Sequence, residues 1–92
     1  MYTKFYTKKF KKSVRKIVHS GFIKRKEIES VIDTIANGDK LNEKYQDHAL
    51  AGEYLGYREC HIRPDILLIY KIEKKIMILI LTNIGSHNEL FK

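Results

Sequence analysis

The chain has 92 residues, of which 18 are Lys or Arg and 11 are Asp or Glu, so its formal net charge is +7. This length allows one small domain, residues 1–92, and excludes a second core. Residues 1–26 contain ten of the basic residues and no acidic residue. Such asymmetry indicates a polyanionic partner, either nucleic acid or an acidic protein or membrane surface.

The cysteine content and the apolar runs indicate the compartment. The single cysteine, Cys60, cannot form an internal disulfide, and its apolar surroundings predict a buried thiol. The longest apolar run, residues 76–81, is six residues long, so no transmembrane or signal segment is predicted. We therefore expect a protein of the reducing cytoplasm with no membrane partner.

The first half of the chain predicts a strand and two helices. Residues 2–6 alternate aromatic and polar side chains, as in a short strand. A helix is predicted next, because apolar residues recur at helical spacing among basic ones: Phe10, Val14, Ile17 and Val18. A second helix has its own stripe: Ile28, Val31, Ile32 and Ile35. Gly21 and the Asn37-Gly38 pair are plausible stops, so the two helices form a hairpin that needs a sheet to cover.

The second half predicts that sheet. Residues 57–62 favour a strand, residues 63–65 a proline turn, and residues 66–72 and 76–81 two central strands. The connection over residues 38–54 is polar and has no clear period. Ser86 and Glu89 match a capping box, which predicts one helical turn at the C-terminus.

The expected fold is therefore α+β. A short N-terminal strand precedes a two-helix hairpin, which packs on a mostly antiparallel four-stranded sheet followed by a short C-terminal helical turn.

Three of the four histidines fall near one edge of this predicted sheet. His19 ends the first helix and is expected at the surface, whereas His48, His61 and His87 could converge with Asp65. Their spacing matches no standard zinc signature, and without metal the same set suits proton transfer at neutral pH. The alternative is that each histidine only makes surface hydrogen bonds.

Motifs in the second half resemble a known family. Residues 47–52 read DHALAG, residues 56–65 read GYRECHIRPD, and residues 85–91 read GSHNELF. In this order and spacing they closely resemble the YafQ branch of the RelE/ParE toxin superfamily, whose members are toxins of bacterial type II toxin-antitoxin systems. The two helices of the first half agree with that family in order and length but not in distinctive residues.

The resemblance implies a ribosome-dependent mRNA endoribonuclease that needs no metal or other cofactor. The 2′-hydroxyl would attack the adjacent phosphate, leaving a 2′,3′-cyclic phosphate and a 5′-hydroxyl. The implied catalytic residues are His48, His61, Asp65, His87 and Phe91. Within that set we expect His87 to be the acid and His61, oriented by Asp65, to share base and charge stabilisation with His48.

The implied partners are a cognate antitoxin, with which a heterotetramer is expected, and the 70S ribosome with its mRNA. Basic residues are expected to contact RNA or the ribosome: Lys8, Lys9, Lys11, Lys12, Arg15, Lys16, Arg58 and Arg63.

Two positions depart from the family pattern. Asn83 stands where an arginine is usual, and Ile66 where an aromatic residue is common. The arginine would stabilise the phosphorane charge, so Arg58 or Arg63 would have to substitute for it, or activity would be attenuated. Two alternatives therefore stay open: a non-cleaving module that binds RNA, the ribosome or an antitoxin, and a gyrase-poisoning relative, which would not explain the histidines.

Overall fold

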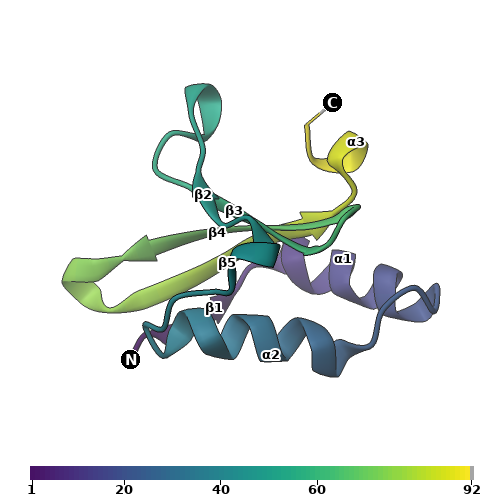
Figure 1. The fold of residues 1–92 in the computed structure, drawn as a ribbon, viewed down its shortest axis with the longest axis horizontal. Coiled ribbons are helices and arrows are strands. Elements are labelled where there is room, and N and C mark those ends of the chain that lie inside the picture. Colours follow the sequence, from purple (N-terminus) through teal and green to yellow (C-terminus); the bar gives the residue numbers. More distant parts are fainter. Residues whose placement is uncertain (92) are drawn as a thin grey trace.

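The computed structural model describes residues 1–91, which form a sheet with a helix pair on one face (Figure 1). The strands are β1 (Thr3–Tyr6), β2 (His48–Ala49), β3 (Arg58–Arg63), β4 (Ile66–Glu73) and β5 (Ile78–Gly85). The helices are α1 (Lys8–His19), α2 (Arg25–Ala36) and the short α3 (His87–Leu90). Single 3-10 turns lie at η1 (Glu43–Tyr45), η2 (Gly52–Tyr54) and η3 (Lys74–Ile76).

The strand order across the sheet is β1-β5-β4-β3-β2, with β1 parallel to β5 and every other pair antiparallel. The α+β prediction is therefore correct, whereas the predicted number of four strands is wrong for residues 1–91, which form five. The strand β2 was missed because two residues are too few to show a period.

The main core lies between the sheet and the helix pair. On β4 and β5, alternate side chains such as Leu68, Tyr70 and Leu81 are at most 2% exposed and face the helices. The predicted stripes of α1 and α2 supply the other side of this core, and Cys60 is fully buried within it. Among residues 1–91, no helix has the length and apolar character needed to span a membrane.

The last strand is displaced from its predicted position. The apolar run predicted a strand over residues 76–81, but β5 begins at Ile78 and continues to Gly85. Ile76 and Met77 lie in the turn, 65% and 44% exposed, and Met77 adopts a left-handed conformation (φ 54°). The run was misread because hydrophobicity alone cannot separate a strand start from a turn of apolar residues.

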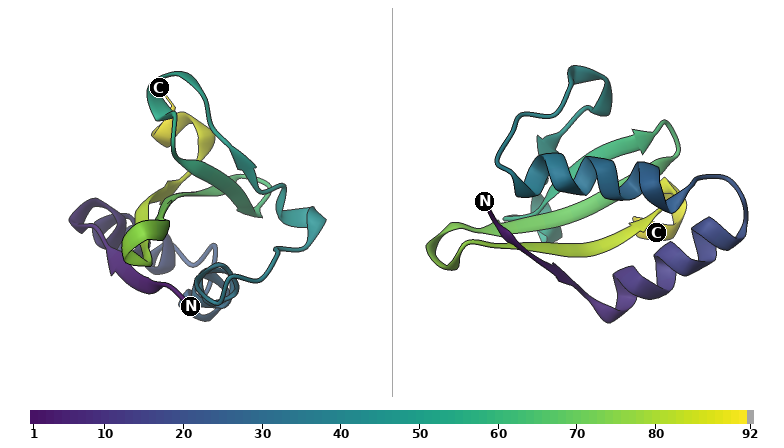
Figure 2. Two further views of the ribbon diagram at one scale, coloured as in Figure 1. Left: turned by 90° about the vertical axis from the view of Figure 1, so that its left-hand side faces the viewer. Right: turned by 90° about the horizontal axis from the view of Figure 1, so that it is seen from below.

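The opposite face of the sheet has a smaller cluster of its own. Leu67 and Ile69 of β4 meet Leu90 of α3 there, and half-buried side chains pack around them: Leu50, Tyr54, Tyr57 and Phe91. Figure 2 shows α3 and the loop around η2 rising on this face, away from α1 and α2. They border a region of the sheet that neither helix of the hairpin covers.

Candidate functional site

Strand alternation places two of the predicted histidines on this uncovered face. His48 pairs with Glu59 across β2 and β3, and His61 pairs with Leu67 across β3 and β4. Paired residues in antiparallel strands point to the same side, and Leu67 belongs to the cluster opposite the helices. His48, Glu59 and His61 therefore project from one side of the sheet.

Glu59 lies between the two imidazoles. Its side chain is 8% exposed, and its Oε1 is 3.3 Å from His61 Nε2 and 3.6 Å from His48 Nε2. The two rings are 6.4 Å apart between centroids. The sequence analysis missed Glu59, although its place two residues before His61 on a predicted strand already put both on one face.

The orientation of His48 is set by its own chain. His48 Nδ1 is 2.7 Å from the carbonyl oxygen of Gln46, which adopts a left-handed conformation (φ 50°) at the end of η1. A carbonyl can only accept a hydrogen bond, so Nδ1 must be the donor. The other nitrogen, Nε2, is the one that faces Glu59, and it is left to accept or release a proton.

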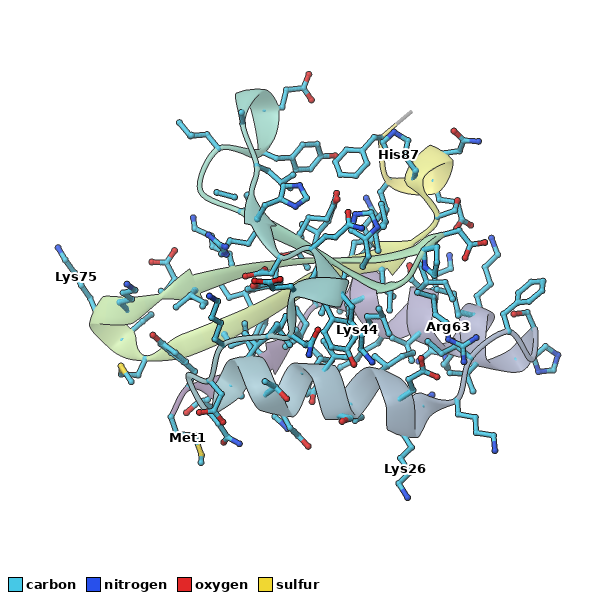
Figure 3. The ribbon with its side chains drawn as sticks, in the orientation of Figure 1. Met1, Lys26, Lys44, Arg63, Lys75 and His87 are labelled. Atoms are coloured by element: carbon cyan, nitrogen blue, oxygen red, sulfur yellow. The ribbon has the colours of Figure 1, made fainter. Side chains whose placement is uncertain are left out.

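The predicted capping box at α3 is confirmed. Ser86 Oγ accepts from the backbone N–H of Glu89, and Glu89 Oε1 accepts from the backbone N–H of Ser86. This short helix presents His87 (Figure 3). The centroid of the His87 ring is 5.2 Å from that of Phe91. The Phe91 ring in turn meets Tyr54 edge-on at 5.3 Å, and the Tyr54 hydroxyl donates to the carbonyl of Leu90. The η2 loop therefore braces the end of the chain that presents His87.

Asp65, which was expected beside His61, lies in the turn after β3. Within residues 1–91, the carboxylate that pairs with His61 belongs to Glu59 and not to Asp65. Asp65 is exposed in the β3–β4 turn and lines a cavity of about 250 Å³ whose walls include Ser86 and Glu89. The orienting role expected of Asp65 stays a prediction, and in the structure the carboxylate next to His61 is that of Glu59, while β3 continues to Arg63 before the turn that contains Asp65.

The two arginines expected to contact RNA already have carboxylate partners. Arg58 Nη2 is 2.9 Å from Asp47 Oδ2, and this hydrogen bond is the main cause that raises the pKa of Arg58. Arg63 makes two hydrogen bonds to Glu27 of α2, at 2.7 and 2.8 Å, which hold the pKa of Glu27 below its usual value. Either arginine would have to leave its partner before it could take the place of the arginine missing at position 83.

Asn83 is also engaged. Its Oδ1 accepts from Ser13 Oγ of α1 at 2.8 Å and from the backbone N–H of Ile84 at 2.9 Å. The asparagine therefore ties β5 to α1.

The six basic residues predicted on α1 are all exposed, along the side of the helix that the core does not use: Lys8, Lys9, Lys11, Lys12, Arg15 and Lys16. Lys16 lies 3.5 Å from Glu89 of α3, so one end of this basic surface reaches the helix that presents His87. Residues 1–91 contain no group of three or more His, Cys, Asp or Glu side chains arranged to hold a metal ion.

Comparison with known proteins fits this geometry. The family model described as the bacterial toxin YafQ of a type II toxin-antitoxin system matches residues 2–92. The chain belongs to the YafQ family. The expected resemblance is thereby confirmed over nearly the whole chain, including the helix pair that lacks distinctive residues.

Two curated relatives align with part of the chain. A YafQ relative from Haemophilus influenzae is 52% identical over 42 residues, which cover 46% of this chain and 41% of that protein. The mRNA interferase toxin YafQ of Escherichia coli K12 is 42% identical over 57 residues, covering 62% of this chain and 60% of that protein. The aligned stretches therefore span less than two thirds of either YafQ relative.

Solved YafQ-like structures share the whole fold. A metal-bound toxin from Helicobacter pylori is 42% identical, with a TM-score of 0.92 and coverage of 99% of this chain and 100% of that one. YafQ in the E. coli DinJ-YafQ complex is 29% identical, with a TM-score of 0.84 and full coverage of both chains. The chain therefore has the same overall fold as these solved toxins.

Proposed function

We propose that this YafQ-family toxin is a ribosome-dependent mRNA endoribonuclease whose histidines act as acid and base without a metal. The observation that carries the proposal is the pair of imidazoles facing one buried carboxylate on the uncovered face of the sheet. The name of the E. coli relative, mRNA interferase toxin, supports the same activity. The proposed partners are the 70S ribosome with its mRNA and a cognate antitoxin, in the cytoplasm.

In the proposed reaction, a 2′-hydroxyl gives its proton to an imidazole and attacks the adjacent phosphate. His61 or His48 takes this proton at Nε2, and the imidazolium that forms is stabilised by Glu59. His87 donates a proton to the departing 5′-oxygen, and Phe91 packs against the His87 ring. The products are a 2′,3′-cyclic phosphate and a 5′-hydroxyl.

The RNA would lie across surfaces that flank these histidines. A cavity of about 460 Å³ opens beside His61, and its lining includes Lys44 and Gln46. The basic residues of α1 would neutralise phosphates of the ribosomal RNA. Asp65 is assigned to the catalytic group by family resemblance alone, and its exposed position beside the α3 cavity suits contact with RNA rather than support of His61.

A second candidate function is that of a weakened or non-cleaving homologue that binds the ribosome or an antitoxin. The observation in its favour is Asn83, which replaces the usual arginine and has its oxygen committed to Ser13 and Ile84. Loss of one charged contact to the phosphorane typically costs on the order of a hundredfold in rate.

The test is mRNA cleavage on programmed 70S ribosomes, with 5′ ends mapped by primer extension. We expect the chain to cut and His87→Ala to lose cutting by at least about a hundredfold. A chelator selective for transition metals, which spares the Mg²⁺ of the ribosome, should leave the rate unchanged.

Asn83→Arg separates the two candidates in the same assay. An inactive native chain beside an active Asn83→Arg variant would identify a disabled nuclease on an intact scaffold. If neither the native chain nor Asn83→Arg cleaves mRNA while both still bind the ribosome, the nuclease function is refuted and the binding function remains.

A further inference from the structure

Asp47, the residue before His48, is held from two neighbouring strands. Its Oδ2 accepts from Arg58 Nη2 of β3 at 2.9 Å, and its Oδ1 accepts from the hydroxyl of Tyr70 of β4. Arg58 and Tyr70 are directly paired across the two strands, on the side of the sheet that faces the helices. The three side chains form a cluster that we call the Asp47 latch.

The latch is partly shielded from water. Tyr70 is 2% exposed, whereas the Asp47 side chain is 26% and the Arg58 side chain 39% exposed. Burial, followed by the hydrogen bond to Asp47, raises the pKa of the Tyr70 phenol, so the hydroxyl remains a donor. A carboxylate that accepts from a guanidinium and a phenol in such a place is bound more firmly than a surface ion pair.

The strand that follows the latch is short and lies at the edge of the sheet. Strand β2 consists of two residues at the edge of the sheet, and both of them are exposed. Its only strand partner among residues 1–91 is β3, and after β2 the chain turns away through η2. A short, uncovered edge strand opens easily. The side chain of Asp47 therefore anchors the start of this segment against the sheet, while Leu50, whose N–H donates to the carbonyl of Tyr57 at 2.9 Å and whose side chain packs in the smaller cluster, anchors its end.

We propose that Asp47, gripped by Arg58 and Tyr70, is the positioning residue for His48 in RNA cleavage. The claim that this positioning supports cleavage rests on the proposed function. The claim that the latch orients His48 does not depend on it. Successive residues of a strand point to opposite faces, so an anchor at Asp47 on the helix-facing side fixes the ring of His48 on the other.

The latch acts on both ring nitrogens of His48. It fixes the backbone so that the Gln46 carbonyl meets Nδ1, which makes Nδ1–H the neutral tautomer and leaves Nε2 directed at Glu59. With the latch released, the ring loses the Gln46 contact and Nε2 no longer has a set direction. Misplacement of a catalytic group by about 1 Å is enough to cost on the order of a hundredfold in rate.

The first experiment reads the His48 tautomer in the isolated protein by ¹⁵N-edited NMR of the histidine rings. Tyr70→Phe removes one hydroxyl from the latch and keeps the ring in the core, and Asp47→Asn removes the charge. Tyr6→Phe is the matched control, because its hydroxyl also donates to a carboxylate, that of Glu29 at 3.0 Å, but from β1 at the other edge of the sheet.

We expect His48 to be Nδ1-protonated in the native chain and to shift toward a tautomer mixture in both latch variants, while His61 and His87 stay unchanged. Tyr6→Phe should leave all three rings as they are. An unchanged His48 in Tyr70→Phe and Asp47→Asn, with only a loss of stability like that of Tyr6→Phe, would overturn the proposal.

The second experiment measures single-turnover cleavage on saturated ribosomes. Tyr70→Phe should lower the rate about tenfold or more with ribosome affinity unchanged. A full rate in a variant whose His48 tautomer has shifted would overturn the catalytic role of the latch. If His48 responds to the latch but the native chain cuts nothing, the positioning of His48 stands and the proposed nuclease function fails.

Discussion

At the scale of single residues, Glu59 determines what the two nearby histidines can do. Its carboxylate is 8% exposed and within 3.6 Å of two Nε2 atoms, so it is placed to accept a hydrogen bond from either imidazolium. In a general-base role this arrangement stabilises the imidazolium formed when the 2′-hydroxyl loses its proton. Glu59 would thereby do for His61 what was expected of Asp65.

We predict that Glu59→Gln lowers single-turnover mRNA cleavage by roughly tenfold to a hundredfold without a matching loss of ribosome binding. The amide keeps the size of the side chain and removes the charge that supports the imidazolium. Glu73→Gln is the control, because Glu73 pairs with Lys71 at the far end of β4. An equal loss in both variants would show that Glu59 has no special place in the reaction.

The sequence located the histidines but not their partners. Motif spacing singled out His48, His61 and His87, because the motifs that resemble the family contain these three histidines. Strand alternation alone would have put Glu59 beside His61, but its contact with His48 and the Asp47 latch could not be recognised in that way, because both depend on the register between strands. The register between β2 and β3 depends on a two-residue pairing that leaves no periodic signal.

At the scale of elements, α3 depends on its capping box. Four residues are too few for a helix to persist in water, so the reciprocal bonds of Ser86 and Glu89 and the packing of Leu90 must hold it. The hydrogen bonds from Ser86, followed by the nearby Lys16, hold the pKa of Glu89 below its usual value of 4.5. The charge of Glu89 thus contributes to the helix that presents His87.

The sign of this effect gives a prediction. A lowered carboxyl pKa means that the stabilisation is present above the unfolded value and is lost as the pH falls through the native one. Glu89→Gln should therefore cost about 0.5 kcal/mol of unfolding free energy at pH 7, a small value because the side chain is half exposed. Below about pH 4.5 the difference from the native chain should shrink toward zero.

Urea unfolding of the native chain and Glu89→Gln between pH 7 and pH 3 measures this difference. In a Ser86→Ala background the pH dependence should weaken but persist, because the variant removes the hydroxyl of Ser86, the second cause of the lowered pKa, and keeps its backbone N–H, the largest cause. A difference between native and variant that is the same at pH 7 and pH 3 would contradict the assignment.

The elements that could be predicted from the sequence were those long enough to show a hydrophobic period. The helices α1 and α2 have full apolar stripes, and both formed where the stripes indicated. Strand β5 started two residues late, because Ile76 and Met77 are apolar residues in a turn. The connection over residues 38–54 concealed η1, β2 and η2, because β2 is defined by its pairing with β3 and η2 packs through Tyr54 against the C-terminal residues Leu90 and Phe91.

At the scale of the whole molecule, the basic surface and the candidate site lie on different parts of the fold. The basic residues belong to α1, which lies in the helix layer on one face of the sheet (Figure 1). His48, Glu59 and His61 project from the opposite face. The two meet where Lys16 approaches Glu89. This arrangement lets α1 contact ribosomal RNA while the histidines remain open to mRNA.

The α1 surface should therefore control affinity rather than chemistry. We predict that replacing Lys8 and Lys12, which are exposed one turn apart on α1, by Gln weakens ribosome binding and lowers the slope of log K against log salt by about one per lost phosphate contact. The cleavage rate on saturated ribosomes should not change. The matched control replaces Lys74 and Lys75, two exposed lysines in the β4–β5 turn (Figure 3).

Equal changes of slope in the two double variants would show that the ribosome responds to net charge alone, since each removes two positive charges. A lower cleavage rate at saturation in the α1 variant would instead place α1 against the reacting mRNA. The expected pattern, a change in slope confined to α1 with an unchanged rate, assigns anchoring to the helix layer and chemistry to the far face of the sheet.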